Sequence, residues 1–139
     1  MTRTLHRATL VAASALIAAI VTTTAHAQGT ASPRVVSTSP ASEAVVPAGT
    51  TVIRVTFDQT MMANSHSYVT SQNGAFPECA FPPQRLPDGK TFEVTCRTAP
   101  AARYALWFNH APYLNFVSEA KTPAEPFELR FATAPAAAR

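Results

Sequence analysis

Glycine, cysteine and long apolar runs are scarce in this chain, and each scarcity excludes a class of protein. The 139 residues include four glycines and two cysteines, against 12 prolines. Beyond residue 27 no stretch approaches the roughly 20 consecutive apolar residues that a membrane-spanning helix requires. Because glycine is rare and proline abundant, we expect extended segments separated by proline-containing turns, without long helices.

Clustered basic residues and catalytic motifs are also missing. The lysines and arginines after residue 27 are scattered, so the basic patch typical of a nucleic-acid-binding domain is absent. Nucleophilic catalysis needs a base and an orienting acid beside a serine or cysteine, and the chain has no G-x-S-x-G element. We therefore expect no nucleic-acid partner, no enzymatic activity and no cofactor.

Carboxylates suited to glycoside hydrolysis are present but dispersed. Glu93 and Glu128 fall at outward-facing positions of expected strands, and the others lie in separate turns. We interpret all of them as solvated charges. The residues considered are Asp58, Glu78, Glu93, Glu119, Glu125 and Glu128.

The first 27 residues have the pattern of a cleaved secretory signal peptide. Arg3 and Arg7 precede an apolar core of about 14 residues, and Ala25 and Ala27 form an A-x-A cleavage site. This core is too short to span a bilayer, so no transmembrane anchor is expected. The predicted cleavage after Ala27 makes the protein periplasmic or secreted.

Removal of the signal peptide leaves one domain of nearly neutral charge. Arg3 and Arg7 are lost and no acidic residue is, so nine basic and eight acidic residues remain. About 112 residues suffice for one core and are too few for two. We expect a short linker over residues 28–32, a domain over 33–134 and a disordered tail over 135–139.

Alternation of apolar and polar residues predicts the strands of this domain. In the segment TVIRVTF, Ile53, Val55 and Phe57 would face the core. Three later segments, KTFEVTCR, RYALWFN and FELRFAT, alternate in the same way. Weaker strands fit RVVSTS, SYVTS and residues 77–81. The expected inward residues of the three later segments are Phe92, Val94, Cys96, Tyr104, Leu106, Phe108, Phe127, Leu129 and Phe131.

Cys79 and Cys96 are expected to form a disulfide. An even pair of cysteines in an exported protein is most simply a structural bridge. The sequence LPDGK between them has proline and glycine where a tight turn needs them, so a hairpin would bring both cysteines to its base.

About seven short strands without a helical segment predict an all-β fold. Two antiparallel sheets that bury their inner faces, an immunoglobulin-like sandwich, fit this pattern best. A closed barrel is the alternative. In either case function is expected at loops and exposed edges.

Both ends of the domain resemble the bacterial Ig-like domain of the SbsA type, over residues 32–134. The opening follows a pattern of Pro-x-Val, Ser-Pro-Ala, Val-Pro and Val-x-Phe-x-x-x-Met. The end follows Tyr-x-Leu-x-x-Asn and then Pro-x-x-Pro-x-x-Leu-x-Phe-x-Thr. The matching residues are Pro33, Val35, Ser39, Pro40, Ala41, Val46, Pro47, Val55, Phe57, Met61, Tyr104, Leu106, Asn109, Pro123, Pro126, Leu129, Phe131 and Thr133.

This resemblance implies a non-catalytic module that acts in binding or structural support in the cell envelope, with an exported protein or envelope component as partner. A fainter similarity is to periplasmic copper carriers of the CopC type. Those carriers use a histidine at the mature N-terminus, where this chain would have Gln28. A small copper-binding protein is therefore the alternative function.

Met61, Met62 and His66 are the residues on which that alternative rests. Thioether and imidazole groups suit Cu(I). Adjacent strand residues point to opposite faces, however, so both methionines converge only where the chain has left the strand. We interpret Met61 as a core residue and Met62 as the start of a loop, and expect no metal site.

An aromatic and amide-rich segment after the strand RYALWFN is the expected binding surface. Aromatic faces beside amide groups suit sugar or peptide ligands. The simpler alternative is that these aromatic residues cover the sheet and fix a loop. The residues of this predicted surface are Trp107, Asn109, His110, Tyr113, Asn115 and Phe116.

Overall fold

The computed structural model of the protein describes residues 31–138. The predicted signal peptide, residues 1–27, lies outside this range, as do residues 28–30 of the predicted linker and Arg139 of the predicted tail. Residues 135–138 are exposed and have no regular secondary structure. No helix of membrane-spanning length and hydropathy occurs in the described range.

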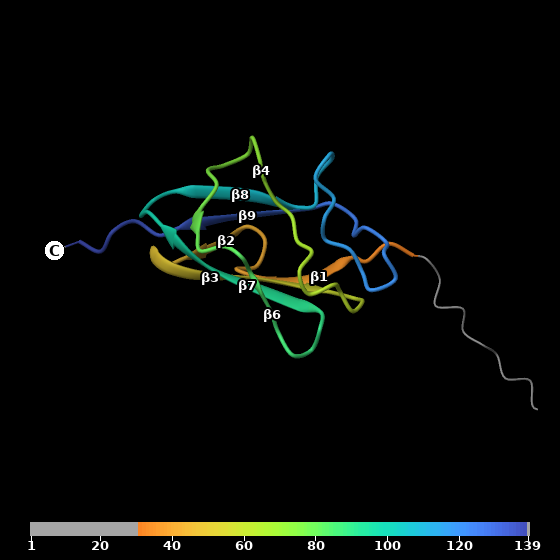
Figure 1. Cartoon of the computed structure of the whole chain (residues 1–139). Coiled ribbons are helices and arrows are strands. Elements are labelled where there is room, and N and C mark those ends of the chain that lie inside the picture. Colours follow the sequence, from red (N-terminus) through yellow and green to blue (C-terminus); the bar gives the residue numbers. More distant parts are fainter. Residues whose placement is uncertain (1–30, 139) are drawn as a thin grey trace, which may run out of the picture.

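Two β-sheets make up the described residues, as the sequence predicted (Figure 1). In Figure 1 they form two layers, and residues 110–125 form loops at the end opposite the C-terminal residues. Sheet A has the order β1 (Val35–Ser39), β3 (Gly49–Phe57), β7 (Thr91–Thr98), β5 (Glu78–Cys79), and β6 (Gln84–Arg85) also pairs with β7. Sheet B has the order β2 (Ala44–Val46), β9 (Phe127–Thr133), β8 (Arg103–Phe108), β4 (Tyr68–Thr70).

A single hydrophobic core fills the space between the sheets, which makes the fold a β-sandwich. Ile53, Val55 and Phe57 are at most 1% exposed, as alternation predicted. The inward residues predicted for β7, β8 and β9 are also in this core, with Phe127 only half-buried at its margin. The outer side of sheet A is polar, and there Arg54 pairs with Glu93 on the neighbouring strand at 2.8 Å.

The structure has nine strands in the described range, where the sequence predicted about seven. Strand β2 was missed because three residues are too few to show alternation. It pairs in parallel with β9, so the sandwich is not wholly antiparallel. Of the segment predicted as a strand over residues 77–81, only β5 is a strand, and β6, which follows Pro82 and Pro83, was also missed.

The predicted disulfide between Cys79 and Cys96 is confirmed and links β5 to β7. Ala80 N–H donates to Thr95 O at 2.8 Å, which makes Cys79 and Cys96 a non-hydrogen-bonded pair, the type with the closer side chains. The LPDGK turn is also present, with a positive φ of 70° at Gly89.

The chain leaves sheet B after β4 and crosses to sheet A. Ala75 exchanges backbone hydrogen bonds with β8, donating to Arg103 O and accepting from Ala105 N, each at 3.0 Å. Gly74 lies so close to β8 that a Cβ there would stand 2.8 Å from Ala105 N. This close crossing ends β4 after three residues and leaves its outer edge open.

Candidate functional site

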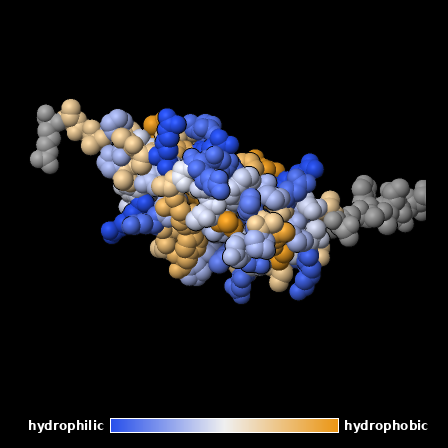
Figure 2. All heavy atoms as spheres, turned by 90° about the horizontal axis from the view of Figure 1, so that it is seen from above, coloured by the Kyte–Doolittle hydropathy of each residue, from blue (hydrophilic) through white to orange (hydrophobic). Residues whose placement is uncertain are grey.

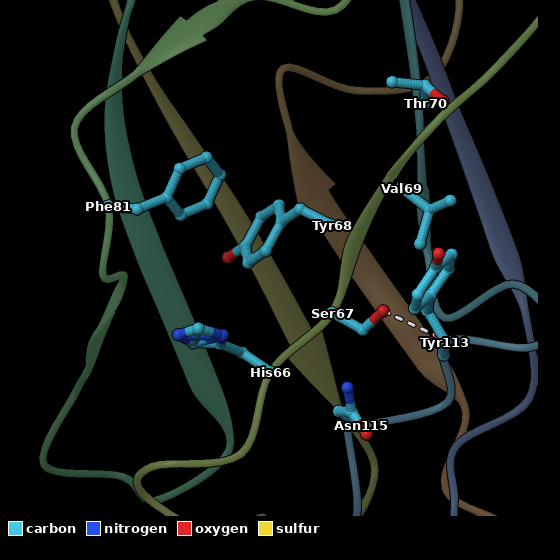
Figure 3. Close-up of a pocket in the computed structure, with 8 residues that line it drawn as sticks. All are labelled: His66, Ser67, Tyr68, Val69, Thr70, Phe81, Tyr113 and Asn115. Atoms are coloured by element: carbon cyan, nitrogen blue, oxygen red, sulfur yellow. Dashed lines mark hydrogen bonds between the residues drawn. The ribbon is translucent and has the colours of Figure 1, made fainter.

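An open groove of about 450 Å³ runs along strand β4 (Figure 3). Five consecutive residues of β4 and its N-terminal flank form its length, and Phe81, Tyr113 and Asn115 form its sides. In Figure 3, His66, Tyr68 and Phe81 lie on one side of the β4 ribbon, and Val69 and Tyr113 lie on the other. We call this feature the β4 groove, lined by His66, Ser67, Tyr68, Val69, Thr70, Phe81, Tyr113 and Asn115.

Three rings form the wall on the side of the sandwich interior. Phe81 lies with its ring centroid 5.1 Å from that of Tyr68 and 6.5 Å from that of His66. Tyr68 in turn packs edge-on against Phe108 of the core at 5.3 Å. Phe81 is 44% exposed, so its ring closes the gap between the sheets and presents an apolar face to the groove.

The opposite wall is held to β4 by hydrogen bonds to the loop that follows β8. Ser67 Oγ donates to Tyr113 O at 2.7 Å, and Ser65 Oγ donates to Asn115 O. The side chain of Tyr113 is 59% exposed beside Val69. The fixed backbone of this loop therefore presents a large exposed aromatic ring at the mouth of the groove.

Burial shifts the pKa of two side chains that line the groove, in each case toward the uncharged form. Partial burial lowers the pKa of His66 below its ordinary value. Burial also raises the pKa of Tyr68, so its phenol stays protonated. Tyr68 Oη is buried and has no hydrogen-bond partner among the described residues. The groove is thus an apolar, neutral surface with few polar groups, suited to binding.

The structure corrects the predicted surface at two positions, because Asn109 and Phe116 are each 0% exposed. Continued alternation would turn Asn109 outward after Phe108. Instead its φ of 59° turns the chain, and the side chain enters the interior. There its amide donates to Phe116 O and Ala124 O, and its Oδ1 accepts from Phe116 N. Asn109 thus fixes the loop rather than contacting a ligand.

The other four residues of the predicted surface lie near β4. Tyr113 and Asn115 line the groove. Trp107 pairs with Val69 across the β4–β8 ladder, and its ring lies 4.8 Å from that of exposed His110. Trp107 and His110 therefore extend the outer wall and do not line the groove.

Of the residues considered for copper, Met61 is buried in the core at 0% exposure. Met62 is half-buried in the following loop, and His66 belongs to the groove. Burial removes the Met61 thioether from any exposed set of ligands. In the described part of the chain, no three His, Cys, Asp or Glu side chains are grouped to hold a metal ion.

The inner wall of the groove was missed by the sequence-based prediction of a surface. Alternation placed SYVTS in a weak strand, and nothing local indicated that Tyr68 and Phe81 would meet. The available signal was Phe81 itself, an aromatic residue at the end of a weak predicted strand and directly before two prolines.

Elsewhere on the described surface, a smaller groove of about 270 Å³ lies along β1, lined by Val35, Val36, Ser37, Thr38, Ala41, Ser42 and Phe127. Seen from above the view of Figure 1, small apolar patches are separated by polar residues (Figure 2). Glu93, Glu119 and Glu125, which were predicted to be solvated carboxylates, each pair with a different arginine. Glu128 departs from that prediction, because its side chain is only 8% exposed and its carboxylate accepts hydrogen bonds from Ser71, Asn73 and Arg130. Comparison of the chain with protein-family models and with curated proteins finds no match.

Proposed function

We propose that this protein is an exported, non-catalytic, immunoglobulin-like module that binds an exported protein or another component of the cell envelope through the β4 groove. The observation that carries this proposal is the groove itself, which has apolar walls and a volume of about 450 Å³ and is flanked by the exposed rings of Phe81 and Tyr113. Wide clefts with apolar walls and a few polar groups are typical of binding sites.

The order of the strands supports the immunoglobulin-like assignment. In such domains one sheet has the order A-B-E-D and the other contains C, F and G. Here β1, β3, β7 and β5 follow the first order, and β4, β8 and β9 follow the second. Tyr104 adds a second indication, since its Oη accepts from Ala99 N at 2.7 Å across the β7–β8 corner. This matches the tyrosine corner of immunoglobulin-like folds.

Export is supported by the signal-peptide pattern of residues 1–27 and by the disulfide between Cys79 and Cys96. Disulfides persist mainly in oxidising compartments. A non-catalytic role is supported by the chemistry of the groove, because its lining has no carboxylate to orient His66 as a base, and the Ser67 hydroxyl donates to Tyr113 O rather than to His66.

The test is capture of a partner from the envelope of the producing cells. We expect the double substitution Phe81→Ala and Tyr113→Ala to keep the circular dichroism spectrum of the native fold and to lose the captured partner. The matched control truncates two apolar side chains elsewhere that are at least as exposed, Val36→Ala and Val45→Ala, and should retain capture. Equal capture by all variants would exclude the groove as the binding site.

A further inference from the structure

The free edge of β4 gives the groove backbone hydrogen-bonding groups in addition to its apolar walls. Asn109 N–H donates to Ser67 O, so the pair Tyr68 and Phe108 is of the non-hydrogen-bonded type. The backbone N–H and C=O groups of Tyr68 and Thr70 therefore point away from β8, toward the groove. Within residues 31–138 no strand pairs with this edge.

The β4 edge also lacks the features that protect the other sheet edges. Proteins block edge pairing with charged residues, proline or a cover. Strand β1 follows Pro33 and Arg34, and β2 lies between Glu43 and Pro47. Strands β5 and β6 are flanked by Pro77, Pro82 and Pro83, and the disulfide ties β5 to β7. By contrast, residues 65–71, SHSYVTS, contain no proline, lysine, arginine or carboxylate.

Resting on the proposed function, we propose that the β4 groove binds an extended, uncharged segment of a partner polypeptide, which adds to β4 as a further strand of sheet B. Alternating N–H and C=O groups at the edge are complementary to the backbone of an extended chain. Side chains of an added strand alternate between faces. One set would meet Phe81 and Tyr68, and the other would meet Tyr113 and Val69.

The uncharged lining and the short length of the groove favour a flexible segment of a partner over a second folded copy of this protein. No side chain of the groove carries a carboxylate, an ammonium or a guanidinium group, so a charged segment would gain no partner there. Five lining residues span about 13 Å at the rise of a β-strand, enough for about four or five added residues. A contact of this length buries far less than the roughly 800 Å² per partner of a stable interface between folded proteins.

The first measurement uses nonapeptides selected from a displayed random library on the protein purified from the cell. We expect selected peptides to alternate apolar residues, and their binding to slow amide hydrogen exchange at Tyr68 and Thr70 by about tenfold or more. The amide of Val69 already lies within the β4–β8 ladder and is the internal control. Ligands held only by side chains would leave the Tyr68 and Thr70 amides unchanged.

The matched variants are Thr70→Pro and Thr70→Ala. Thr70→Pro removes the outward N–H together with the exposed threonine side chain, and an edge strand tolerates proline at such a position. It should weaken binding of the selected peptide by about tenfold, the value of one or two backbone hydrogen bonds. Thr70→Ala loses the same exposed side chain but keeps the N–H, and should bind like the wild type. If Thr70→Pro does not fold, the exchange measurement alone decides.

Four outcomes would overturn strand addition: no selected peptide, unchanged exchange at Tyr68 and Thr70, binding of a cello- or chito-oligosaccharide at the groove instead, or dimerisation of the protein through β4. Each of these leaves the proposed function standing if capture still depends on Phe81 and Tyr113. If capture does not depend on them, the proposed function itself fails.

Discussion

At the scale of single residues, buried polar groups determine how the loop that follows β8 is held. The Asn109 side chain makes hydrogen bonds with three backbone groups of two segments, of which Phe116 O also accepts from Ala124 N. It does so from a left-handed conformation that asparagine tolerates better than most residues. Tyr68 is the opposite case, since its hydroxyl is buried without a partner in the described range.

We predict that Asn109→Ala lowers the free energy of unfolding by about 3 kcal/mol, because it leaves buried backbone groups unpaired. Urea denaturation measures this change. The same substitution at exposed Asn115 is the control and should alter stability by less than about 0.5 kcal/mol. Equal effects at both positions would contradict the role assigned to Asn109.

Tyr68→Phe should raise the free energy of unfolding by about 1 kcal/mol, since it removes an unsatisfied buried hydroxyl. Tyr104→Phe is the matched control, because Tyr104 Oη accepts from Ala99 N at 2.7 Å. Its loss should destabilise the protein by about 1–2 kcal/mol. Thermal and urea unfolding of both variants measure these two changes in the free energy of unfolding. Destabilisation by Tyr68→Phe would mean that the hydroxyl has a partner, such as a buried water.

The binding surface predicted from the sequence shows where the alternation of apolar and polar residues no longer predicts the direction of a side chain. The sequence placed Trp107 in a clear strand and Tyr113 in the loop after it, and the structure has both there. Asn109 was misplaced because a single positive φ reverses the direction of a side chain, and no periodicity records that. Phe81 joins Tyr68 only through tertiary structure.

At the scale of elements, long strands were predictable and short ones were not. Strands β3 and β7 have one buried face each, so their apolar residues alternate over eight or nine positions. Strands β2, β5 and β6 have two or three residues, too few for a period. Their positions depend on the neighbours with which they pair.

The disulfide stabilises the edge of sheet A and holds the segment that leads to Phe81. For a loop of about 17 residues, the loop-entropy estimate gives about 3 kcal/mol. We predict that replacing Cys79 and Cys96 together by alanine lowers the free energy of unfolding by about this amount. Added reductant should destabilise the wild type and leave the double variant unaffected. Equal stability of the two proteins would contradict this contribution.

The turn between β6 and β7 should give stability a dependence on acid pH. The hydroxyl of Thr91 and the backbone N–H groups of Lys90 and Thr91 donate to Asp88, which lowers the pKa of its carboxyl below 3.8. Because the folded pKa is depressed, this contribution is complete above pH 3.8 and is lost as the pH falls through the folded pKa. The wild type should therefore lose stability toward pH 2.

Asp88→Asn is the comparison for that dependence. It should be less stable than the wild type at pH 7, and the difference should shrink at pH 2. Urea unfolding at both pH values gives the two differences. A difference that is constant across this range would show that the Asp88 charge does not contribute.

At the scale of the whole molecule, the two sheets bury a single apolar core between them, and their edges differ in how they are protected. Three edges carry proline, charge or a disulfide, while the β4 edge carries neutral residues between two exposed aromatic rings. Charge, proline or a cover on an edge strand blocks pairing with another chain, so an edge that binds a partner must lack them. The same property makes β4 the site to examine for partner contact.

Photo-crosslinking in the producing cell tests this account most directly. A benzophenone amino acid is placed at Tyr113, beside the β4 groove, or at Val36, which is equally exposed on β1. We predict that irradiation yields a discrete adduct from position 113 and none from position 36. Adducts from position 36 alone, or from neither position, would contradict binding at the groove.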